Sequence, residues 1–450
     1  MAKTFVSSLN AADGSESIVP GASPVPVDPF LPNSANLFPK LVERINDAAW
    51  ELWQFDGLSS DGETAVTISF YRDTRGLQDG GFHAELNALW PDGSKWGEKL
   101  YFTESVITAE GEAAHNGSLR GVWQSQSQSQ SQSHSQSPGE GGSTRSKTNS
   151  VSFDIAADLA TARVTFSVPD RVEGTLELRA LSRAPLGSRL AATEEAAKLG
   201  PSVYYLFPLG PAAVAADLVF SLADETEDEA AAAATSLETN GAVNGDHKKD
   251  KKKTLILRPE DGARGGFVRG WSALAWPQIM TDAYYVCGTA GPYMLQVIRI
   301  ESSAADGRKP HVVARLYRDG ELVCAANQLG ERHAQSQTEN GGHGHNRDED
   351  VVVVDKLLDG GEEGWLAGAF RDRNTGYAIE FIQGTKREGH QQQQQRKRWR
   401  FQARHRRPWW SDYTSDKGTG KSGFLETILG GSDEEASFKG SAGAGQLQLP

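Results

Sequence analysis

The chain has 450 residues and a formal net charge of −13 at pH 7. Such an acidic balance does not favour a nucleic-acid partner, because phosphate binding depends on clustered Lys and Arg. Its two cysteines, Cys287 and Cys324, are too few for a disulfide framework or a zinc cluster, so a reducing compartment is expected.

The N-terminal stretch is rich in Pro, Ser and Asp and predicts an extended arm over residues 1–36. Residues 1–32 lack the apolar core of a secretory signal, and no run of about 18 apolar residues is present to span a bilayer. We therefore expect a cytoplasmic protein without a membrane span.

Three segments after this arm alternate apolar and polar residues, which is typical of strands. They cover residues 49–56, 65–71 and 82–90. Successive side chains of a strand point to opposite faces, so each segment has one apolar face. The opposite face carries Gln54, Asp56, Tyr71, Glu85 and Asn87. Periodicity alone favours a solvated surface there, and the alternative is a cavity lined by polar groups and aromatic rings.

Strand patterns continue to the C-terminal part of the chain, with hardly a long helical period between them. They cover residues 100–107, 151–155, 162–168, 172–181, 203–208, 212–222, 284–288, 292–300, 311–317, 321–326, 351–354, 365–370, 377–382 and 399–405. Many short strands separated by turns predict an all-β protein built from sandwiches or barrels.

Low-complexity stretches divide the chain into two predicted domains. A linker over residues 223–265 separates a domain at 37–222 from a domain at 266–450. Gln/Ser-rich, polar and Gln-rich inserts at 124–150, 330–350 and 386–397 cannot bury a core and are expected to be disordered.

No motif identifies a cofactor or a metal. Gly418–Ser422 resembles the end of a phosphate-binding loop, but the required upstream Gly and strand are missing. The Gly-rich stretch 440–445 lacks dinucleotide spacing, and His343 and His345 have no structured third ligand. Asp56 and Glu85 could act as a general acid and base, yet without a visible partner histidine they do not identify a particular reaction.

Aromatic density is the more telling feature of the sequence. Most of these rings are expected in cores, and several could wall an apolar ligand site. The residues are Tyr204, Tyr205, Trp271, Trp276, Tyr284, Tyr285, Trp365, Trp399, Trp409 and Trp410.

Several ungapped motifs resemble one protein family, the fungal lipocalin-like Diels-Alderases that form decalin rings in polyketide–tetramic acid pathways. The motifs are LFPK (37–40), WELWQFDG (50–57), GPSVYY (200–205), WSALAWPQIMT (271–281), ARLYR (314–318) and RNTGY (373–377). The resemblance covers residues 35–445 once the inserts are set aside.

The resemblance implies an N-terminal β-sandwich-like domain packed on a C-terminal lipocalin-like β-barrel, with a cofactor-free substrate pocket between them. It implies a stereoselective intramolecular [4+2] cyclisation of a linear polyenoyl tetramic acid to a decalin. A polyketide synthase–peptide synthetase hybrid would supply that substrate.

The residues that match the family's pocket divide into two groups. The resemblance implies catalytic roles for Asp56, Glu85, Asn87 and Lys421, of which Lys421 is the expected donor to a tetramate carbonyl. It implies substrate-binding roles for Gln54, Tyr71, Tyr205, Trp276 and Trp410. Two alternatives use the same pocket: a non-catalytic carrier of a hydrophobic metabolite, and a polyene hydratase or isomerase.

Overall fold

The computed structural model describes residues 3–8, 25–42, 45–46, 48–73, 82–110, 117–125, 149–182, 190–222, 251–330, 348–358, 374–385, 396–413 and 420–449. Within these ranges the regular secondary structure is almost entirely strand. The helical segments are α4 (Trp276–Ile279) and the 3-10 turns η1 (Pro259–Asp261) and η2 (Ala304–Asp306). None of the helices in these ranges has the length and apolar character needed to cross a bilayer.

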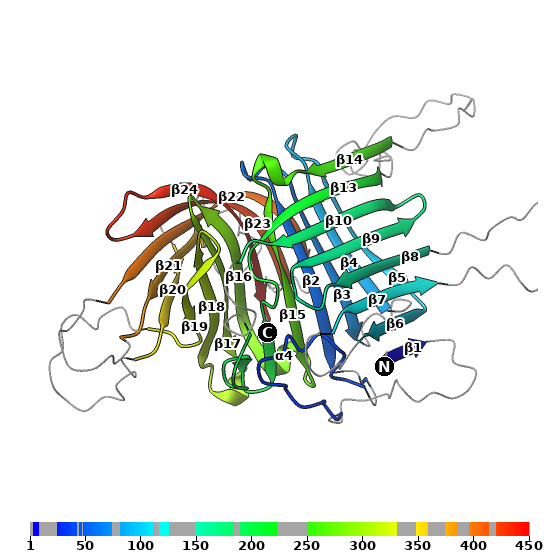
Figure 1. Ribbon diagram of the computed structural model, residues 1–450, viewed down its shortest axis with the longest axis horizontal. Coiled ribbons are helices and arrows are strands. Elements are labelled where there is room, and N and C mark those ends of the chain that lie inside the picture. Colours follow the sequence, from blue (N-terminus) through cyan, green and yellow to red (C-terminus); the bar gives the residue numbers. More distant parts are fainter. Residues whose placement is uncertain are drawn as a thin grey trace, which may run out of the picture.

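The first fifteen strands form one sheet that folds over itself into a sandwich, on the right of Figure 1. They are β1 (Lys3–Ser8), β2 (Trp50–Leu58), β3 (Ala65–Asp73), β4 (Phe82–Leu89), β5 (Lys95–Phe102), β6 (Glu104–Ala109), β7 (Leu119–Ser125), β8 (Asn149–Ile155), β9 (Thr161–Val168), β10 (Val172–Ala180), β11 (Lys198–Gly200), β12 (Val203–Leu206), β13 (Ala212–Leu222), β14 (Lys251–Leu257) and β15 (Arg264–Ser272). The main path runs β1-β6-β7-β8-β9-β10-β13-β15-β2-β3-β4-β5, with β14 beside β13 and β12 beside β15.

The core of the sandwich is the apolar face that the sequence predicts for residues 49–90. Trp53 and Phe70 are fully buried on this face. The ring centroid of Phe70 lies 5.0 Å from that of Trp123 on β7, and the ring of Trp53 lies 5.8 Å from that of Phe153 on β8. The two halves of the sheet are therefore held together by aromatic packing.

The remaining nine strands form a nearly closed barrel, on the left of Figure 1. They are β16 (Met280–Ala290), β17 (Tyr293–Ser302), β18 (Pro310–Arg318), β19 (Glu321–Ala326), β20 (Val351–Leu357), β21 (Gly376–Ile382), β22 (Arg398–Tyr413), β23 (Gly420–Ser432) and β24 (Phe438–Gln448). Their order is β19-β18-β17-β16-β24-β23-β22-β21-β20, and a bridge between Leu329 and Val352 brings the two ends together. The predicted all-β fold, a sandwich packed on a barrel, is confirmed.

Strand β16 contributes one face to the barrel core and the other face to a pocket. Tyr284 and Val286 belong to the apolar cluster inside the barrel. Because side chains alternate along a strand, Tyr285 and Cys287 point outward to the sandwich, where they line a pocket.

Several predicted segments differ from the structure. The predicted linker 223–265 includes residues 251–257, which form β14, and β15 begins at Arg264 and pairs with β2. The strand pattern of 251–257 was hidden by its three lysines, a residue type that is common on edge strands. The domain division itself stays a prediction, although β15 belongs to the sandwich and not to the barrel.

Other differences concern single strands. The predicted strand 100–107 is two strands, β5 and β6, that separate at Thr103, and part of the predicted N-terminal arm is β1, which pairs with β6. Sequence patterns gave no indication of β23 and β24, because their glycines have low strand propensity. The predicted strand 365–370, the histidines at 343 and 345, and most of the predicted inserts lie outside the described residues.

Candidate functional site

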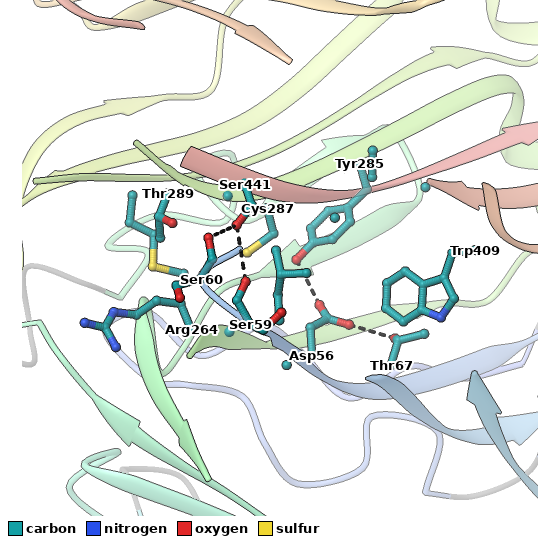
Figure 2. A pocket seen from close by; sticks show the side chains of 18 of the residues that line it. Asp56, Ser59, Ser60, Thr67, Arg264, Tyr285, Cys287, Thr289, Trp409 and Ser441 are labelled. Atoms are coloured by element: carbon teal, nitrogen blue, oxygen red, sulfur yellow. Dashed lines mark hydrogen bonds between the residues drawn. The ribbon is translucent and has the colours of Figure 1, made fainter. Parts of the chain in front are cut away.

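A pocket of about 610 Å³, counted with the space that opens to solvent, lies between the sandwich and the barrel (Figure 2). The sandwich contributes Gln54, Asp56, Gly57, Leu58, Ser59, Ser60, Thr67, Gly262, Arg264 and Gly265, and the barrel contributes Tyr285, Cys287, Gly288, Thr289, Met294, Trp409, Trp410, Ser441, Gly443, Ala444 and Gly445.

The polar face predicted for residues 49–90 points toward the barrel. Cross-strand register places Asp56, Thr67 and Asn87 in one row, and Gln54, Ser69 and Glu85 in the next. Thr67, Ser69 and Asn87 are buried. Periodicity alone favoured a solvated surface for this face. The structure instead shows the alternative, a buried cavity wall.

Asp56 accepts hydrogen bonds from three side chains around the pocket. The amide of Gln54 donates to both carboxylate oxygens at 3.1 and 3.2 Å, and the hydroxyl of Thr67 donates at 2.7 Å. The phenol of Tyr285 donates from the barrel at 3.0 Å, as Figure 2 shows. This last bond joins the two halves of the protein through the pocket.

The surroundings of Asp56 shift the titration of its carboxyl to higher pH. Burial raises the pKa of this carboxyl, and the hydrogen bonds from Thr67, Gln54 and Tyr285 offset only part of that effect. No cation forms an ion pair with Asp56 among the described residues. Burial also raises the pKa of Cys287 to about 12, so its thiol stays protonated. The pocket therefore offers hydrogen bonds and little reactive charge near Asp56.

Replacing Asp56 with Asn is expected to stabilise the fold increasingly as the pH rises. A carboxyl with a raised pKa binds its proton more tightly in the folded state, so wild-type stability falls as pH rises from about 4 through the folded pKa. Asn lacks this titration. Urea unfolding at several pH values between about 4 and about 8 measures the difference. A constant difference across that range would contradict the expected titration, and Asp154→Asn at an exposed ion pair with Arg120 is the control.

Glu85, Asn87 and Lys421 form a second polar group, beside the pocket lining. Lys421 of β23 lies 2.5 and 2.6 Å from the two oxygens of Glu85 on β4, and the amide of Asn87 donates to Glu85 at 3.4 Å. Burial tends to raise the pKa of Glu85, but the Lys421 ammonium, together with Lys99 and His83, holds the pKa below its usual value. The ion pair thus fastens the barrel to the sandwich.

Tyr71, Tyr205 and Trp276 belong to an apolar cluster between the sandwich and the barrel. Tyr71 stacks on His83 at 4.7 Å, and Trp276 of α4 stacks on Trp50 at 3.9 Å between ring centroids. Burial raises the pKa of Tyr205, with a further contribution from nearby Asp56. These three residues lie outside the pocket lining, whereas Gln54, Asp56 and Trp410 are part of it.

Two irregularities in β22 bring adjacent tryptophans to the pocket. The register with β23 shifts between His405 and Arg407 and again between Pro408 and Trp410. Each bulge inserts one residue and so changes the face to which the next side chain points. Trp409 and Trp410 consequently both line the pocket, which simple alternation along a strand would not allow.

Glycines of β23 and β24 make room for these rings. A Cβ on Gly423 would lie 2.3 Å from Nε1 of Trp410, so the indole rests directly on the backbone there. Gly443 and Gly445 face the pocket at alternate positions, after Ser441. The stretch 440–445, whose glycines do not have the spacing of a dinucleotide-binding motif, therefore forms a flat wall of the pocket. Small residues at every second position are the sequence pattern that indicates this wall.

Other pocket residues were missed as well. Thr67 lies on the predicted polar face, but only the cross-strand register shows that it reaches Asp56. Tyr285 was one of several aromatic candidates, and the choice between it and Tyr284 depends on which side of β16 faces the barrel interior. Tyr204 and Trp271 stack on each other in a separate core cluster, with ring centroids 4.6 Å apart.

Comparisons with known proteins identify relatives of this chain. A family model described as Diels-Alderase-like matches residues 1–450. Diels-Alderase gNR600 of Fungal sp. (strain NRRL 50135) is 49% identical, with 100% of each chain covered, and Diels-Alderase phm7 of Pyrenochaetopsis sp is 39% identical, with 95% of each covered. A crystal structure of CghA with Sch210972 matches with a TM-score of 0.75 at 30% identity, covering 99% of this chain and 98% of that one.

Proposed function

This chain belongs to the Diels-Alderase-like family, and we propose that it converts a linear polyenoyl tetramic acid into a decalin by a stereoselective intramolecular [4+2] cycloaddition. The chain is an enzyme, and its curated relatives support a Diels-Alder cyclase role. The tetramic acid and the decalin are the parts that we propose. The substrate would come from a polyketide synthase–peptide synthetase hybrid in the cytoplasm of a fungus that makes such secondary metabolites.

The observation that carries this proposal is the pocket between the two sheets. One side offers the hydrogen-bonded group around Asp56, and the other offers the rings of Trp409 and Trp410. A Diels-Alder step transfers no proton, so its rate depends on holding diene and dienophile in one folded conformer. A rigid aromatic wall opposite a polar anchor suits that task, because the wall decides which face of the chain can react.

Asp56 has the chemistry to act on the substrate directly. A neutral carboxyl can donate one hydrogen bond, and its raised pKa favours that form. Donation to the carbonyl conjugated with the dienophile would stabilise the charge that shifts to this oxygen in the transition state. Gln54, Thr67 and Tyr285 would hold the carboxyl in position.

The remaining predicted residues have supporting roles in this proposal. Lys421 forms an ion pair with Glu85, and Asn87 donates a hydrogen bond to the same carboxylate. These three residues would hold the sandwich strands in position beside Trp410. Tyr71, Tyr205 and Trp276 would shape the apolar continuation of the channel, since all three belong to the apolar cluster between the two sheets.

The test is to incubate the purified chain with a synthetic linear polyenoyl tetramic acid and follow the product by mass spectrometry and NMR. We expect a decalin of unchanged mass as one predominant diastereomer, against a mixture without protein. A product heavier by one water would establish a hydratase instead. An unchanged substrate that binds tightly would favour a carrier.

A further inference from the structure

Arg264 is a cation on the pocket wall that the proposed mechanism does not yet use. It begins β15 and lies opposite Leu58 of β2, and it is the only Lys or Arg among the residues that line the pocket. Figure 2 shows it at the end of the pocket away from Trp409.

Most N–H groups of the Arg264 guanidinium make no hydrogen bond within the described part of the chain. One nitrogen, Nη1, donates to the backbone carbonyl of Ala263 at 2.9 Å. In the described part of the chain, no carboxylate lies within ion-pair distance of Arg264, whereas Arg406 and Arg407 both contact Glu63. A guanidinium has five N–H groups, so most of its capacity is open to a ligand.

The position of Arg264 relative to Asp56 follows from the strand register. Gly266 of β15 lies opposite Asp56, and Arg264 precedes Gly266 by two residues. Residues two apart in a strand point to the same face and lie roughly 7 Å apart along it. Arg264 and Asp56 therefore start from adjacent rows of one wall and belong to the same face of the sheet.

The two groups differ in the kind of oxygen that they can hold. A neutral Asp56 donates to a carbonyl, while Arg264 attracts a negative charge and can bind it with two parallel hydrogen bonds. A 3-acyl tetramic acid has both kinds of oxygen, because it ionises at neutral pH to an enolate delocalised over neighbouring carbonyls. On a chain with a net charge of −13, a local cation also offsets the general repulsion of such an anion.

We propose that Arg264 binds the ionised oxygen of the substrate's acidic head group, and thereby fixes which way the polyene enters the pocket. The inference rests on the proposed function. It places the head between Arg264 and Asp56 and directs the polyene toward Trp409 and Trp410. Lys421, the donor to a tetramate carbonyl that the family resemblance implies, forms an ion pair with Glu85 and lies outside the pocket lining.

The test measures binding without cyclisation. The probes are a 3-acyl tetramic acid with a saturated chain, which cannot react, and its neutral O-methyl ether. Titration calorimetry compares the unmodified chain with Arg264→Gln, Arg264→Lys, Lys421→Gln and Arg171→Gln. Arg171 pairs with Glu98 outside the pocket lining and controls for loss of one positive charge.

Arg264→Gln is expected to weaken binding of the acid by about 10- to 100-fold and to change binding of the ether by less than about threefold. Arg264→Lys should lose less, because it keeps the charge, and thermal melts confirm that each variant is folded. Equal affinity of the unmodified chain and folded Arg264→Gln for the acid would overturn the inference, as would a loss confined to Lys421→Gln. If the unmodified chain binds neither probe, the substrate class is wrong, and the inference falls together with it.

Discussion

Replacing Glu51 with Gln is expected to lower the free energy of unfolding by about 3–5 kcal/mol. Glu51 of β2 is fully buried between the equally buried Arg72 and Arg269. One of its oxygens accepts from Arg269 at 2.6 Å and from the backbone N–H of Lys40 at 2.6 Å, and the other accepts from Arg72. Burial lowers the pKa of Arg72 to about 10, although Glu51 acts to raise it. Gln would leave two buried cations without a counter-charge.

Urea unfolding followed by Trp fluorescence measures this change. The control is Glu98→Gln, which breaks the partly exposed pair with Arg171 and should cost less than about 1 kcal/mol. The double variant Glu51→Gln/Arg72→Met should recover part of the loss, because it removes one of the uncompensated charges. A Glu51→Gln variant as stable as the Glu98→Gln control would show that the buried arginines find other partners.

Glu51 also shows where prediction from the sequence stops. Alternation identified the strand 49–56 and separated Trp53 and Phe55 from Gln54 and Asp56, and the structure agrees. The same pattern gives no sign that Glu51, which points to the apolar side, is paired with two arginines. Those arginines come from β3 and β15, and only strand order brings them together.

The two walls of the pocket also differ in how far the sequence predicts them. The polar wall could be predicted, because all its members come from neighbouring strands with one period. The opposite wall could not, because it depends on two bulges in β22 and on glycines in β23 and β24 that alternation does not describe. Arg264 was missed for a similar reason, since the range 223–265 was interpreted as a linker.

Replacing Gly423 with Ala is expected to lower the turnover number about 100-fold, because it moves one wall of the proposed cyclisation site. A Cβ on Gly423 would lie 2.3 Å from Nε1 and 2.5 Å from Cε2 of Trp410. The indole must shift, and its displacement enlarges or reshapes the space in which the polyene folds. Overpacking should also cost about 1–3 kcal/mol of stability. Initial rates and the diastereomer ratio of the product measure the effect on the reaction.

The matched control is Gly431→Ala, on the same strand and outside the pocket lining. A Cβ at that position would lie 3.3 Å from Cδ2 of Phe438, so packing tightens away from the pocket and the change in rate should stay below about threefold. The diastereomer ratio separates a shifted wall from a general loss of folding. A displaced Trp410 should move the ratio toward that of the uncatalysed reaction, whereas a smaller folded fraction should reduce the rate at an unchanged ratio. Similar rates and ratios for the two variants would mean that Trp410 does not guide the cyclisation.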